Sequence, residues 1–146
     1  MYRFLTSLFG TAVLALAALA AVPAQAQTQA YSAHMTAADE VPPNDSMGTG
    51  TVDMVYDKAS GVLRWSVRYS GLTGPVKAGH IHGPAEVGKN APVVQPCAAP
   101  LESPFSGSAT ISAAQAADLE AGRWYVNLHT AAHAGGEVRG QVLPAP

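Results

Sequence analysis

Apolar residues occupy alternate positions from Val62 to Tyr69, and this alternation constrains the fold more than any other feature of the sequence. Side chains of a β-strand project to its two faces in turn, so one face of this segment carries Leu63, Trp65, Val67 and Tyr69. The polar residues between them then face solvent. The pattern predicts a strand with one face in the core.

Other short segments with similar patterns follow at intervals of about 8–12 residues, separated by turns rich in glycine and proline. Together they make about seven predicted strands, at 31–36, 50–56, 62–69, around His80, 105–111, 123–130 and 137–143. This spacing predicts an all-β fold, a Greek-key-like β-sandwich or barrel.

Two segments depart from the strand pattern. The sequence from Ser112 to Gln115 has the form of a capping box, which predicts one short helix that ends at Gly122. Residues 83–104 are irregular and rich in proline, glycine and alanine, and a loop of this length in a small domain is usually functional or covers something.

The first 26 residues have the pattern of an export signal. Arg3 precedes the apolar run Leu8–Ala21, and Ala24-Gln25-Ala26 has the form of a cleavage site. The run is shorter than the roughly 20 residues that a membrane-spanning helix needs. We therefore expect residues 1–26 to be a signal peptide and residues 27–146 to be one periplasmic or secreted domain, with no membrane attachment after cleavage.

Composition excludes several other functions. The 8 lysines and arginines and 10 aspartates and glutamates give a net charge of −2, without the basic stripe of a nucleic-acid-binding protein. The chain has no G-x-S-x-G, H-E-x-x-H or phosphate-binding glycine loop. Its lone cysteine, Cys97, cannot form a disulfide within the chain; it is buried, paired with another chain, or a metal ligand.

Four of the five histidines form two tight clusters in predicted strands or beside them. His80 and His82 are two residues apart, so they share one face of their strand while Ile81 faces the core. In the second cluster Tyr125, Asn127 and His129 share the polar face. If the two strands are neighbours, three imidazoles converge on one outer face or under the long loop, as in a copper, zinc, iron or nickel site.

Other interpretations of these residues stay open. Histidines at outward strand positions often only form hydrogen bonds. His133 lies in a loop and is a weaker fourth metal ligand, while His34 qualifies only if its strand lies alongside. Arg139 either forms a surface ion pair with Glu137 or holds an anion beside the metal.

Several ordered motifs resemble the CHRD domain, a β-rich module of exported and extracellular proteins. The matching segments are 39–43 (Asp-Glu-Val-Pro-Pro), 71–75 (Gly-Leu-Thr-Gly-Pro), 78–85 (Ala-Gly-His-Ile-His-Gly-Pro-Ala) and 124–142. The resemblance implies an extracytoplasmic domain, and in chordin the context of this module is protein binding.

A fainter resemblance is to the copper-zinc superoxide dismutases. By that similarity His80, His82 and His129 match copper ligands, and Arg139 matches an anion-guiding arginine. With Cys97 as its only cysteine the chain lacks the disulfide of that family, and no zinc-binding loop is found.

The sequence thus predicts an exported domain that binds a copper ion at His80, His82 and His129, with His133 as the weaker ligand, for storage, buffering or redox protection. One alternative is a metal-free module that binds another extracytoplasmic protein. Another is a copper-only enzyme similar to superoxide dismutase.

Overall fold

The computed structural model describes residues 27–146, so the expected signal peptide lies outside the described residues. Within the described part, no helix has both the length and the apolar character needed to cross a membrane.

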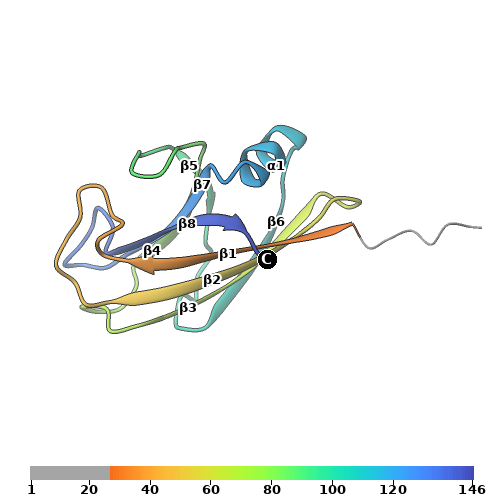
Figure 1. The fold of residues 1–146 in the computed structure, drawn as a ribbon. Helices are drawn as coiled ribbons and strands as arrows, with labels where there is room; N and C mark the ends of the chain where they lie inside the picture. The colour runs from red at the N-terminus through yellow and green to blue at the C-terminus, as the bar shows by residue number, and fades with distance from the viewer. Residues whose placement is uncertain (1–26) are drawn as a thin grey trace, which may run out of the picture.

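Eight strands and one helix make up the fold (Figure 1). In chain order they are β1 (Thr28–Thr36), β2 (Thr49–Asp57), β3 (Val62–Ser70), β4 (Ala78–His82), β5 (Val93–Pro96), β6 (Phe105–Thr110), α1 (Ala113–Glu120), β7 (Trp124–His129) and β8 (Val138–Pro144). The predicted capping box is confirmed, because Ser112 accepts a hydrogen bond from the Gln115 amide and the Gln115 side chain bonds the Ser112 amide.

All eight strands belong to one antiparallel sheet with the order β5-β4-β7-β8-β1-β2-β3-β6. The sheet curls so that its β4–β7–β8 side faces its β1–β2–β3 side, in a nearly closed barrel or sandwich (Figure 1). The chain crosses between these sides from β3 to β4 and again from β5 to β6. The expected all-β class with one short helix is confirmed.

Strand β5 was not predicted, because it lies inside the segment expected to be irregular. It has only four residues, follows Pro92 and ends at Pro96. Proline cannot donate a hydrogen bond to a neighbouring strand, and β5 tolerates it because it is an edge strand.

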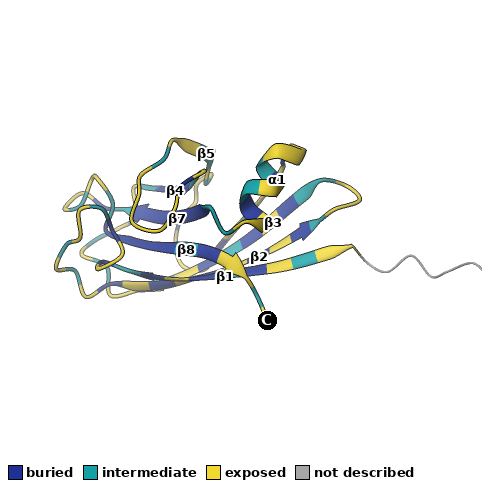
Figure 2. Ribbon diagram, turned by 45° about the horizontal axis from the view of Figure 1, so that its top comes forward, coloured by how far each residue is buried: buried dark blue, intermediate teal, exposed yellow. Residues whose placement is uncertain are grey.

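The inward faces of the strands form one hydrophobic core (Figure 2). As predicted, the core contains Leu63, Trp65 and Val67 of β3 and Trp124, Val126 and Leu128 of β7. Tyr69, also expected on the inward face of β3, is partly buried and packs against this core. Helix α1 adds Ala116 and Leu119 to the buried residues.

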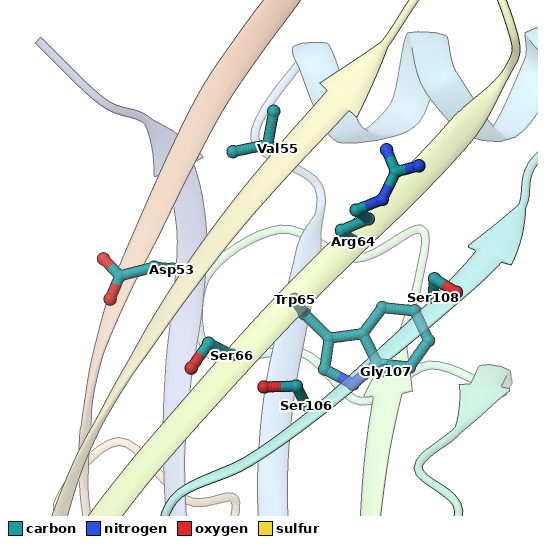
Figure 3. Close-up of a pocket in the computed structure, with 8 residues that line it drawn as sticks. All are labelled: Asp53, Val55, Arg64, Trp65, Ser66, Ser106, Gly107 and Ser108. Atoms are coloured by element: carbon teal, nitrogen blue, oxygen red, sulfur yellow. The ribbon is translucent and has the colours of Figure 1, made fainter.

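Gly107 in β6 makes room for the largest side chain of β3. It pairs with Trp65, and a Cβ atom at position 107 would lie 2.5 Å from the indole Cε2. Figure 3 shows the indole beside Gly107, in a shallow depression lined by residues of β2, β3 and β6 and by no histidine.

We expect replacement of Trp124 by alanine to destabilise the protein by roughly 3–5 kcal/mol, since the fully buried indole would leave a cavity. The free energy of unfolding from urea denaturation measures this loss. Val55→Ala is the control, because Val55 is an exposed residue on β2 and should cost less than about 1 kcal/mol. A loss at Trp124 no larger than the control would contradict the core described here.

Candidate metal centre

Strands β4 and β7 are neighbours, and their pairing brings the two histidine clusters together. His80 lies opposite Asn127, Ala78 opposite His129 and His82 opposite Tyr125. Because the pleat alternates in step on paired strands, these polar side chains share a face while Ile81 enters the core.

Three of the predicted ligands form a compact group. One ring nitrogen of each of His80, His82 and His129 lies within 4.8 Å of the others. The shortest separation, 3.0 Å, is between His80 Nδ1 and His129 Nε2. Nitrogens that share one ion at about 2.0–2.1 Å can be at most about 4.2 Å apart, so a small ring movement would bring all three into range.

Backbone carbonyls determine which ring nitrogens carry protons. His82 Nδ1 lies 2.9 Å from the Ala91 oxygen, and His129 Nδ1 lies 2.9 Å from the Ala134 oxygen. A carbonyl oxygen only accepts, so both Nδ1 atoms donate and each neutral ring keeps a lone pair on Nε2. The two lone pairs point into the group, which is the orientation a metal ion requires.

Asn127 adds a further electron-rich atom to the group. Its Oδ1 lies 3.0 Å from both His82 Nε2 and His129 Nε2. With the amide in this orientation, acceptors face acceptors, and a cation between them would relieve the repulsion.

The face that carries these groups is partly covered rather than open. Tyr125 and Asn127 are buried, and the three histidines are half-buried. The connection from β4 to β5 contacts His82 and Tyr125 through Ala91, and its residues 86–90 are exposed, yellow in Figure 2. The three histidines thus lie on the face of the sheet opposite the core, as expected, and are half-buried there rather than fully exposed.

Burial also adjusts the protonation of the rings. Desolvation lowers the pKa of His80, and the neighbouring His129 and His82 lower it further. Desolvation likewise lowers the pKa of His129, with His82 adding to it and the Ala134 carbonyl opposing it. Both rings are therefore held in the neutral form that binds metals.

The remaining predicted ligands lie outside this group. His133 is partly exposed in the turn after β7, and its amide donates to Thr130 Oγ1. His34 is exposed on β1. Cys97 is a free thiol packed against the core near Gly79, and burial raises its pKa to about 11.

The expected surface ion pair between Arg139 and Glu137 is wrong, because both residues are buried and have other partners. The Glu137 carboxylate accepts hydrogen bonds from Ser46, Thr73 and Thr130. Burial raises the pKa of Glu137, but these bonds outweigh it and hold the pKa at about 2. The ion pair was expected at the surface because an alternating pattern shows only which face a residue occupies. It does not show whether a loop covers that face.

Arg139 instead packs on the site from the side of β8. Its guanidinium carbon lies 3.5 Å from the centre of the Tyr125 ring, which stacks on His82 with 4.7 Å between ring centres. Since β7 lies between β4 and β8, His82 and Arg139 approach opposite faces of this ring. The anion-holding role of Arg139 stays a prediction.

Glu40 was missed as a site residue. It is buried, and desolvation raises the pKa of its carboxyl while Arg139 and a hydrogen bond with Asn127 lower it. It therefore adjoins the amide that faces the histidines. The available signal was its place beside Val41 and two prolines in a turn, but acidic residues in turns are usually solvated.

We expect the metal-free protein to lose stability as the pH falls below about 6.5, the ordinary histidine pKa. Below this pH His80 and His129 bind protons more readily in the unfolded chain than in the folded protein, where their pKa values are lowered. Proton binding therefore stabilises the unfolded state relative to the folded state. Urea denaturation at pH 7.5 and 5.5 measures the loss. His80→Gln should reduce it and His34→Gln should not; an equal loss in wild type and His80→Gln would refute this assignment.

Comparison with known proteins agrees with the motifs. The family model of the CHRD domain matches residues 31–142. No curated protein and no solved structure matches the chain, so the fainter resemblance to superoxide dismutases has no support from these comparisons. CHRD domains occur in extracellular or secreted proteins. Because the match spans nearly all of the described residues, the chain belongs to the CHRD domain family.

Proposed function

We propose that this CHRD domain binds a copper ion through His80, His82 and His129 after export, for storage, buffering or redox protection. The observation that carries the proposal is the convergence of three ring nitrogens within 4.8 Å, two of them oriented by backbone carbonyls. Carbonyl partners of this kind commonly orient histidines that bind metals.

The affinity order of the divalent ions, rather than the ligand types, favours copper. The group contains imidazoles only, with no thiolate or carboxylate among the described residues that form it. Three imidazoles leave a coordination position open, unlike the four-ligand structural zinc site, but catalytic zinc sites share this pattern. For a given nitrogen site, affinity among the divalent ions peaks at copper.

A metal-free interaction module is the second candidate. It is supported by the hydrogen bond between His80 and His129, because these two rings meet part of each other's hydrogen-bonding capacity without an ion. A dismutase-like activity is the third candidate. It would need Arg139 to meet an anion, but both terminal nitrogens of its guanidinium donate to Lys89 and Asn90.

Titration of copper(II) and zinc(II) at pH 7 tests the proposal. We expect one copper ion per chain, bound more tightly than zinc, with nitrogen couplings in the electron paramagnetic resonance spectrum. His82→Ala should lose most of this affinity, because it removes one of three ligands and leaves the core side of β4 unchanged.

Two matched controls are available on the same chain. His34→Ala and His133→Ala remove histidines outside the group, so both should bind copper like wild type. Equal weak binding by wild type and His82→Ala would reject the metal site and favour the interaction module. A full loss in His133→Ala would make that residue a ligand after all. Superoxide decay with the copper-loaded protein tests the third candidate separately.

A further inference from the structure

The segment from Lys89 to Ala91, here called the cover segment, is held on the histidine group by contacts from several strands. The Ala91 carbonyl oxygen accepts a hydrogen bond from His82 Nδ1. The Ala91 amide donates a hydrogen bond to the Tyr125 hydroxyl at a distance of 3.2 Å. The side chains of Lys89 and Asn90 themselves are exposed. The position of the carbonyl that orients His82 therefore depends on what fixes this exposed segment.

Arg139 makes two hydrogen bonds to the cover segment. Its Nη2 donates a hydrogen bond to the Lys89 carbonyl oxygen at a distance of 2.7 Å, and its Nη1 donates one to Asn90 Oδ1 at 3.0 Å. Arg139 is 2% exposed, and its guanidinium lies flat against Tyr125. Charge-assisted bonds from a buried planar group are strong and directional.

A second anchor comes from the turn after β1. Asn90 Nδ2 donates a hydrogen bond to the Val41 carbonyl oxygen at a distance of 3.1 Å. Asn90 therefore links this turn to Arg139. The cover segment is thus fixed on the side away from β4.

We infer that Arg139 is a positioning residue for the metal site: by holding Lys89 and Asn90, it keeps the Ala91 carbonyl against His82 and so presents the lone pair of His82 Nε2 to the ion. This inference rests on the proposed function. It gives Arg139 a role in which it contacts neither the ion nor an anion.

The first test needs no metal. Hydrogen exchange of the Ala91 amide, followed by nuclear magnetic resonance, should be about tenfold faster in Arg139→Gln than in wild type. Amides of the core strand β7 should exchange as before. Asn90→Ala should act in the same direction, and because Asn90 is exposed this variant keeps the core intact.

The second test is copper(II) affinity at pH 7. Residues that orient a ligand typically change metal affinity by about 10- to 100-fold, and we expect a loss of this size in Arg139→Gln and a smaller one in Asn90→Ala. The resonance parameters of bound copper should also change, since His82 would be less well ordered. Arg64→Gln, at an exposed position of β3, is the control and should leave exchange and affinity unchanged.

The outcomes separate the two proposals. Wild-type copper affinity in both Arg139→Gln and Asn90→Ala would overturn the positioning role, as would unchanged exchange at Ala91. If wild type itself binds no copper, the proposed function fails, and the exchange of Ala91 still decides whether Arg139 holds the cover segment.

Discussion

The antiparallel pairing of β4 with β7 is the interaction on which the rest of the site depends. It places Ile81 beside Val126 in the core and His80 beside Asn127 on the opposite face. A shift of one residue in this register would turn the histidines of one strand into the core and expose its apolar residues. The free energy of burying the apolar face therefore also fixes the histidines next to each other.

The second layer of the site comes from chain segments that the sheet alone does not provide. The carbonyls of Ala91 and Ala134, both in connections between strands, direct the lone pairs of His82 and His129 inward. Burial lowers the pKa of His80 and of His129, which favours their neutral forms. The orientation of the imidazoles thus depends on these connections as well as on the pairing of β4 with β7.

The fold was largely predictable because alternation and turn residues are local signals. They located Val62–Ser70 and its neighbours, and the capping box located α1. Strand β5 was missed because its four residues, the last of them Pro96, are too few to show an alternating pattern. Its pairing with β4 is a tertiary contact that local propensity does not encode.

The convergence of His80, His82 and His129 could be predicted from the sequence, but how deeply they are buried could not. Strand alternation placed His80 and His82 on one face, yet it gave no information on the loop that covers them. For the same reason Glu137 and Arg139 were expected at the surface, whereas both are buried under connections from distant parts of the chain. Asn127 and Glu40 gain their significance only through contacts with residues remote in sequence.

We propose that three imidazoles of β4 and β7 hold one copper ion. Anomalous diffraction at the copper edge, from crystals of the copper-loaded protein, would locate the ion. We expect one strong peak at about 2.0–2.1 Å from a ring nitrogen of each of His80, His82 and His129. Peaks confined to other groups, such as His34 or His133, or no peak at all, would contradict it.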